Sequence, residues 1–170
     1  MKYLSITSFL IIFLFSGCLE TQPLFDNEAD LEFLEEYAQR DDVIITESGL
    51  LYRILQEGEG ESPVMSSLVR AHYEVRLVNG DILGSSYDED EPLVIPLAEV
   101  ITGFSEGLML MQEGAEHELV IPPELGYGDL PSDSRIHPGA VLIFKVELLE
   151  IIQEDEDDDI PPASVIPFQF

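Results

Sequence analysis

Hydrophobic and polar residues alternate most regularly along residues 68–78. Val69, Ala71, Tyr73, Val75 and Leu77 fall on one side, and mostly charged or polar residues fall on the other. A period of two predicts an antiparallel strand with one buried face and one solvated face. The pair Asn79-Gly80 follows and favours a tight hairpin turn, so residues 82–86 are expected to return as the next strand.

Shorter apolar stretches predict the other strands, at residues 43–46, 50–55, 93–96, 115–121 and 140–152. Leu31, Leu34 and Tyr37 recur at helical spacing, which predicts a short amphipathic helix from Asp30, its candidate cap, to about residue 40. Antiparallel strands around a single central helix indicate an α+β domain over residues 48–152.

The central helix is expected over residues 99–111. Val100, Ile101 and Phe104 lie at positions i, i+1 and i+4, so on a helix they would form one apolar patch. Gly103 and Gly107 would let another backbone or a ligand come close to this patch. The patch is therefore the candidate floor of a small apolar pocket.

The first residues predict export rather than a folded element. Residues 4–15 are mostly apolar but too short to span a bilayer, which is typical of a signal peptide. The run from Leu14 through Ser16 and Gly17 to Cys18 resembles a bacterial lipoprotein signal. On this interpretation residues 1–17 are removed and Cys18 carries the lipid. A secretory signal with an incidental cysteine is the alternative.

No aspartate follows Cys18, which favours a lipid anchor in the bacterial outer membrane, facing the periplasm, over the inner membrane.

Residues 18–47 are expected to form a tether plus the short amphipathic helix. Residues 153–170 hold six consecutive acids and several prolines, and this composition predicts a disordered tail. Its apolar ending, Ile166-Pro167-Phe168, could occupy the pocket of its own or a neighbouring molecule, although a loose terminus is the simpler interpretation.

Charge excludes several classes of partner. The chain has 7 basic and 35 acidic residues and a formal net charge of −28. Nucleic-acid binding needs clustered basic side chains, and anionic lipid would repel such a chain, so membrane contact is expected through the lipid anchor only. The three histidines, His72, His117 and His137, lie in separate elements without the spacing of a metal site. No cofactor or metal is expected.

A series of short motifs then occurs in one order along the chain. It comprises Phe33-Leu34, Ser48-Gly49-Leu50, Tyr52 to Leu55, Gly58, Gly60, His72-Tyr73, Asn79-Gly80, Glu99-Val100-Ile101, Gly103-Phe104, Glu106-Gly107, Ile121-Pro122-Pro123-Glu124, Tyr127-Gly128, Ile136, Pro138 and Leu142 to Leu148. Together these residues resemble bacterial FKBP-type peptidyl-prolyl cis-trans isomerases over residues 33–152. The long N-terminal dimerisation helix of the macrophage-infectivity type is missing.

The resemblance implies a half-open antiparallel sheet wrapped around one short helix. It also implies a pocket for a proline ring and the preceding residue. Carried over, the substrate-binding residues are Leu83, Leu93, Val100, Phe104, Ile136 and Phe144, and the catalytic ones are Tyr127, Ile101 and Tyr73. The Tyr127 hydroxyl and the Ile101 main-chain N–H would hold the substrate carbonyl.

Three departures from the family pattern concern the pocket. Leu83-Gly84 stands where a Phe-Asp pair is usual, so the one carboxylate of the pocket is missing. Phe104 replaces a tryptophan, and Leu93 replaces an aromatic residue. We therefore expect a reduced catalytic rate and only weak binding of macrolides.

The sequence thus predicts an isomerase that rotates X-Pro bonds in unfolded or loop segments of exported proteins and so assists their folding. The alternative is a non-catalytic FKBP-like binding or chaperone module for Pro-containing segments, which Gly84 favours. A structural lipoprotein that only reuses the fold is a third interpretation, and it predicts no proline-dependent binding.

Overall fold

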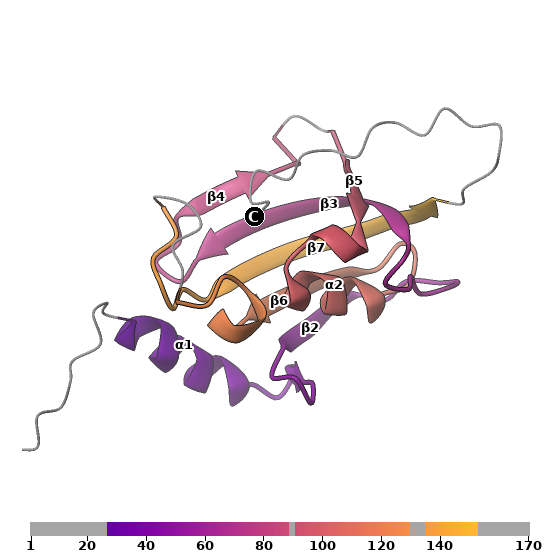
Figure 1. Cartoon of the computed structure of the whole chain (residues 1–170). Coiled ribbons are helices and arrows are strands. Elements are labelled where there is room, and N and C mark those ends of the chain that lie inside the picture. Colours follow the sequence, from indigo (N-terminus) through magenta and orange to yellow (C-terminus); the bar gives the residue numbers. More distant parts are fainter. Residues whose placement is uncertain (1–26, 89–90, 130–134, 153–170) are drawn as a thin grey trace, which may run out of the picture.

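The computed structural model describes residues 27–88, 91–129 and 135–152. Its main feature is a seven-stranded, entirely antiparallel sheet (Figure 1). The strands are β1 (Ile44–Ile45), β2 (Leu51–Gln56), β3 (Leu68–Leu77), β4 (Ile82–Ser85), β5 (Leu93–Pro96), β6 (Glu116–Ile121) and β7 (Leu142–Ile152). They follow the order β1-β2-β6-β7-β3-β4, and β5 also pairs with β3.

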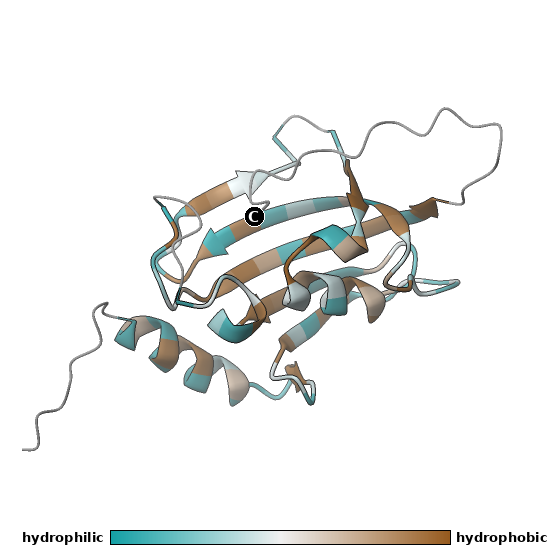
Figure 2. Cartoon of the chain, in the orientation of Figure 1, coloured by the Kyte–Doolittle hydropathy of each residue, from teal (hydrophilic) through white to brown (hydrophobic). Residues whose placement is uncertain are grey.

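The two longest strands, β3 and β7, form the centre of the sheet and pair along almost their whole length. Along β3 every second residue is buried, from Val69 to Leu77, as the alternation predicts. Figure 2 shows hydrophobic and hydrophilic residues alternating along the central strands. β4 and β5 pair with successive parts of β3, so both lie along the edge of β3 that faces away from β7.

The inner face of the sheet packs on helix α2 (Thr102–Met109), which follows the 3-10 turn η1 (Leu97–Glu99). The two glycines of α2 explain how close this packing is. A Cβ atom at Gly103 would lie 2.6 Å from Ile121 Cγ2, and one at Gly107 would overlap the side chain of Leu119. These glycines therefore let the helix approach β6, and their role is in packing the core.

Helix α1 (Glu28–Ala38) packs on the opposite, outer face of the sheet. A second, smaller cluster joins Tyr37 of α1 to Leu51, Val120, Val141 and Ile143. Two polar contacts fix the helix at its ends. Near its start, the Val141 N–H donates to Asp30 Oδ1 at 2.8 Å, and near its end the Tyr37 hydroxyl donates to Glu118 Oε1 at 2.8 Å.

Two details of the predicted helices are wrong. Asp30 does not cap α1, because Asn27 occupies the cap position and Asp30 lies inside the first turn, where its carboxylate binds Val141. The central helix does not begin at Glu99, because Val100 and Ile101 are extended between η1 and α2. Both residues are β-branched, and such side chains favour extended backbone.

Candidate functional site

All nine predicted pocket residues lie in one hydrophobic cluster on the inner face of the sheet. Six are buried, namely Tyr73, Leu83, Ile101, Phe104, Ile136 and Phe144. The other three, Leu93, Val100 and Tyr127, are partly buried and pack against the same cluster. Residues that are far apart in sequence are thus brought together as predicted, and none of the nine is charged.

Three aromatic rings from three elements form the middle of this cluster. Phe104 of α2 lies 4.7 Å from Phe144 of β7, and Tyr73 of β3 lies 6.4 Å from Phe144, measured between ring centroids. The sheet register explains this, because Tyr73 pairs with Val146, two residues from Phe144 on the same face. The three rings are buried and form the apolar, aromatic centre of the cluster.

The extended residues Val100 and Ile101 belong to the same cluster as these rings, Ile101 as a buried member and Val100 as a partly buried one. Ile101 is the N-cap of α2, and its carbonyl accepts from the N–H groups of Phe104 and Ser105. Its own N–H donates to no residue within the described parts of the chain. The Ser105 hydroxyl donates to the Leu97 carbonyl at 2.7 Å and so links α2 to η1. The Ile101 N–H is therefore held in place and is available to an acceptor.

Tyr73 has a fixed main chain and an unpaired hydroxyl. Its N–H donates to Ser86 Oγ at 2.8 Å, and the Ser86 N–H donates back to the Tyr73 carbonyl at 2.9 Å. Among the described residues the Tyr73 hydroxyl has no hydrogen-bond partner, although the side chain is buried. Burial alone raises the pKa of this phenol, so it remains a neutral donor over the physiological range.

Position 84 is close enough to Tyr73 for an aspartate side chain there to reach it, but the residue in this chain is glycine. Gly84 pairs with Val75, whose side chain is on the inner face, and the register shifts at Leu83, so that β4 bulges there. A bulge lets Leu83 turn into the core while Gly84 keeps its place opposite Val75. A side chain at position 84 would therefore point to the inner face near Tyr73.

Residues 135–141 close one end of the cluster and hold Ile136 in it. Arg135 Nη1 donates to the Leu83 carbonyl at 2.9 Å, which links this segment to β4. The Gly139 N–H donates to the Gly128 carbonyl at 2.9 Å, next to Tyr127. The contact of Asp30 with Val141 then fixes the same segment to α1. Three candidate site residues, Leu83, Tyr127 and Ile136, are thus connected through one segment.

Sequence reasoning missed the residues that position this site. Ser86, Arg135 and Asp30 act on site residues or on the segment that bears them, but nothing in the local sequence distinguishes them from ordinary polar residues. The outer face also holds a buried carboxylate, Glu118, which accepts from Tyr37, from Arg53 at 3.0 Å and from Arg76 at 3.0 Å. The only signal for Glu118 was its position next to the apolar end of the strand, residues 119–121.

Other predicted features are placed as follows. Across residues 27–88, 91–129 and 135–152, no three His, Cys, Asp or Glu side chains are grouped so as to hold a metal ion. In those same ranges, no helix has the length and apolar character needed to cross a membrane. The predicted signal peptide, Cys18 and the tail from residue 153 onwards lie outside the described residues.

Comparison with known proteins agrees with this geometry. Residues 59–149 match the family described as FKBP-type peptidyl-prolyl cis-trans isomerase. The chain is 43% identical over 122 residues to the FKBP-type 22 kDa peptidyl-prolyl cis-trans isomerase of Escherichia coli (strain K12), covering 72% of this chain and 59% of that protein. It is 39% identical over 124 residues to the peptidyl-prolyl cis-trans isomerase Mip of Coxiella burnetii, covering 73% of this chain and 54% of that protein.

Solved structures show the same fold. The crystal structure of FkpA from Escherichia coli matches with a TM-score of 0.69 and 40% identity, over 74% of this chain and 59% of that one. The crystal structure of AtFKBP13 matches with a TM-score of 0.59 and 33% identity, over 65% of this chain and 98% of that one. The matched region spans between about half and three-fifths of the length of these curated relatives. The predicted α+β fold, an unclosed antiparallel sheet with a short helix, is confirmed.

Proposed function

The chain belongs to the FKBP-type peptidyl-prolyl cis-trans isomerase family, and we propose on that basis that it catalyses rotation about X-Pro peptide bonds and so assists protein folding. The observation that carries the proposal is the convergence of the rings of Tyr73, Phe104 and Phe144 beside the unbonded Ile101 N–H. Its substrates would be unfolded or loop X-Pro segments of exported proteins. Macrolides would bind weakly.

An apolar site suits this reaction because no bond is broken other than the partial double bond of the amide. The barrier to rotation is about 18–20 kcal/mol, since resonance must be lost. The planar amide is more charge-separated than the twisted one, so an uncharged, apolar pocket binds the twisted form better. A barrier lowered by roughly 5–7 kcal/mol would speed rotation by about four to five decades.

Each proposed role follows from the position of the residue. The proline ring would pack on the surface of Phe104 and Phe144, with Leu83, Leu93, Val100 and Ile136 around it. The Ile101 N–H and the Tyr127 hydroxyl would hold the substrate carbonyl. The Tyr73 hydroxyl, which has no acceptor among the described residues, would donate to a second substrate oxygen.

The second candidate function is a binding module for Pro-containing segments without turnover. Gly84 favours it, because a carboxylate at this place would fix the Tyr73 hydroxyl. An X-Pro peptide isomerisation assay without protease, on residues 19–170, separates the two functions. We expect the wild type to turn over the peptide. Turnover should fall at least about tenfold in Tyr127→Phe, because this variant loses one hydrogen bond to the twisted amide. Tyr52→Phe, which alters a tyrosine stacked on His117, serves as the matched control and should keep its activity.

Gly84→Asp tests the missing carboxylate directly. If the neutral pocket is active by itself, this substitution should change turnover by less than about threefold. If the wild type shows no turnover and the Gly84→Asp variant does, the result would instead support the binding module. Peptide binding without turnover in either protein would exclude the isomerase function.

The cellular placement is a further part of the proposal. Residues 1–17 would be a lipoprotein signal peptide and Cys18 the lipidated residue, followed by a tether and helix to residue 47, the isomerase domain over 48–152 and a tail over 153–170. The lipid would anchor the protein in the bacterial envelope, in the outer membrane facing the periplasm. Incorporation of labelled palmitate that is lost in Cys18→Ser would support this, and equal incorporation in that variant would exclude it.

A further inference from the structure

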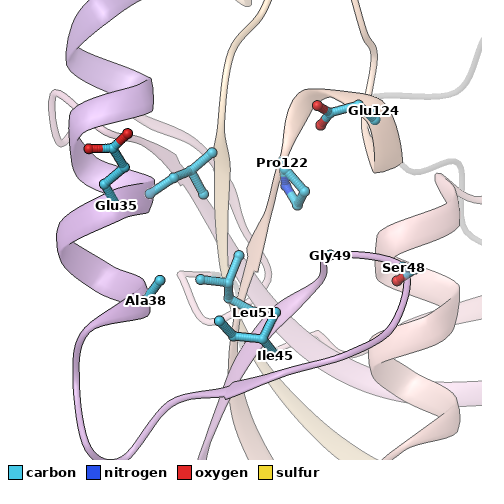
Figure 3. A pocket seen from close by; sticks show the side chains of 9 residues that line it. Glu35, Ala38, Ile45, Ser48, Gly49, Leu51, Pro122 and Glu124 are labelled. Carbon is cyan, nitrogen blue, oxygen red and sulfur yellow. The ribbon is translucent and has the colours of Figure 1, made fainter.

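A groove opens on the outer side of the domain, between the second half of α1 and the turn that connects β1 to β2 (Figure 3). It encloses about 460 Å³, which is within the range of roughly 300–1,000 Å³ typical of ligand sites. Its lining is mostly apolar and includes Leu34, Ala38, Ile45, Leu51 and Pro122. None of the nine residues of the candidate isomerase site lines it, so the two sites are separate.

The apolar surface is exposed within the groove and continues beyond it along α1. Ile45, which lines the groove, is 52% exposed. On α1, Leu31 lies one turn before Leu34 and Glu35, on the same side of the helix, and is 50% exposed. An amphipathic helix normally buries its apolar stripe, whereas this one leaves part of the stripe uncovered. The exposed surface is thus longer than a small molecule needs.

Two unpaired carboxylates stand on opposite sides of the groove. Figure 3 shows Glu35 on α1 and Glu124 across from it, after Pro122. Both are exposed, and neither has a hydrogen bond or ion pair with any described residue.

The basic side chains of the described residues all have other partners. Five form ion pairs elsewhere, namely Arg40, Arg53, Arg70, Arg76 and Lys145, and Arg135 binds the Leu83 carbonyl. The groove therefore has an apolar floor and an uncompensated negative rim, in a chain whose formal net charge is −28.

We propose that this groove is a second polypeptide-binding site, which holds an unfolded segment that combines apolar with basic side chains and needs no proline. The apolar side chains would cover Leu34, Ala38 and Leu51, and lysine or arginine side chains would reach Glu35 and Glu124. Long basic side chains can do both, because their stems pack on apolar surface while their charged ends stay in solvent. Anionic lipid and nucleic acid are repelled by the same rim.

A labelled, proline-free peptide of ten residues that alternates leucine and lysine tests the proposal. Its binding to the purified protein is followed by fluorescence anisotropy, with a leucine–glutamate peptide and a serine–lysine peptide alongside. We expect binding of the leucine–lysine peptide only. Because the probe contains no proline, this result is independent of whether the chain turns over X-Pro bonds.

Charge reversal across the groove gives the decisive variant pair. Glu35→Lys with Glu124→Lys replaces two attractions by two repulsions and should weaken binding at least about tenfold. The control, Glu32→Lys with Glu36→Lys, makes the same change of net charge at exposed positions of α1 that do not line the groove. It should weaken binding by less than about threefold. A parallel X-Pro assay should give the same turnover for both double variants.

A third variant tests the apolar floor. Ala38→Arg fills the groove and should abolish binding, whereas Ala29→Arg makes the same substitution at an exposed position of the same helix and should not. Far-UV circular dichroism checks that each variant is folded. Three outcomes would overturn the proposal: no binding of the probe, an equal loss in both double variants, or a dimer in sedimentation that Ala38→Arg dissociates and Ala29→Arg does not, which would show that a second copy of the chain covers the groove.

Discussion

Asp30 should contribute more to stability than any other acidic residue of α1. Its carboxylate is buried and accepts the Val141 N–H at 2.8 Å, and Val141 is itself fully buried. In Asp30→Ala this N–H would lose its acceptor in a place that water does not reach. A hydrogen bond to a charged group is worth about 1.5–3 kcal/mol. Loss of a negative charge in the first turn of a helix destabilises the protein by a further ~0.3–1 kcal/mol. The better helix propensity of alanine offsets at most about 0.7 kcal/mol of this loss.

The free energy of unfolding should therefore fall by about 2–3 kcal/mol in Asp30→Ala. Urea unfolding followed by far-UV circular dichroism measures it, since the chain has no tryptophan. With a slope of roughly 2 kcal/mol per molar urea, the midpoint should fall by about 1–1.5 M. Asp30→Asn keeps a carbonyl oxygen as acceptor and should lose about half as much.

Glu32→Ala is the matched control, because Glu32 is an exposed acid on the same helix. Its effect should be within about 0.5 kcal/mol of zero. An Asp30→Ala midpoint equal to that of Glu32→Ala would refute the role assigned to the carboxylate. Equal losses in Asp30→Ala and Asp30→Asn would show that the charge matters and the acceptor does not.

Three further substitutions test the two faces of the sheet. Burial lowers the pKa of His117, so below pH ~6.5 the unfolded chain takes up a proton that the folded chain does not, and the protein becomes less stable as the pH decreases. In His117→Phe the melting temperature should therefore fall less between pH 7.5 and pH 5.5 than in the wild type. Tyr37→Phe removes the bond to Glu118 and should cost about 1–2 kcal/mol in urea unfolding, without changing X-Pro turnover. Gly107→Ala should cost about 1–3 kcal/mol in the same assay although alanine favours helix, because its methyl group would overlap Leu119; a gain in stability would contradict the packing described.

The sheet was largely predictable because its signals are local. Strict alternation over β3 determines which face is buried, and the bounds predicted for β5 are those observed. The candidate site could be assembled from the sequence only through the family resemblance, since its residues lie on different strands, on α2 and in loops. Helical spacing indicates only the patch of Val100, Ile101 and Phe104, and composition and periodicity alone would have left Phe144 as an ordinary core residue.

The missed features depend on contacts between distant residues. Tyr37 and Glu118 are 81 positions apart, and Asp30 and Val141 are 111 positions apart. Amphipathicity predicts that α1 has an apolar side but not which surface covers it. The sequence therefore places this helix after the tether without indicating its partner, and the structure adds that it packs on the outer face of the sheet.

The two faces of the sheet separate charge from the candidate site. Among the described residues the buried carboxylates are Asp30, which belongs to α1, and Glu118, which accepts from Tyr37 of α1. The outer face also holds Arg53 and Arg76, which both donate to Glu118. In the described part of the chain, the hydrophobic cluster of the inner face has no acidic or basic member, although Arg135 contacts its edge, and burial favours the neutral form of His117. A pocket that favours the less polar, twisted amide gains from this separation, because a fixed charge nearby would stabilise the planar form. Gly84 also leaves the inner face without the carboxylate of the family pattern, which would otherwise fix the Tyr73 hydroxyl. The protein can thus carry a formal net charge of −28 while its proposed active site stays electrically neutral.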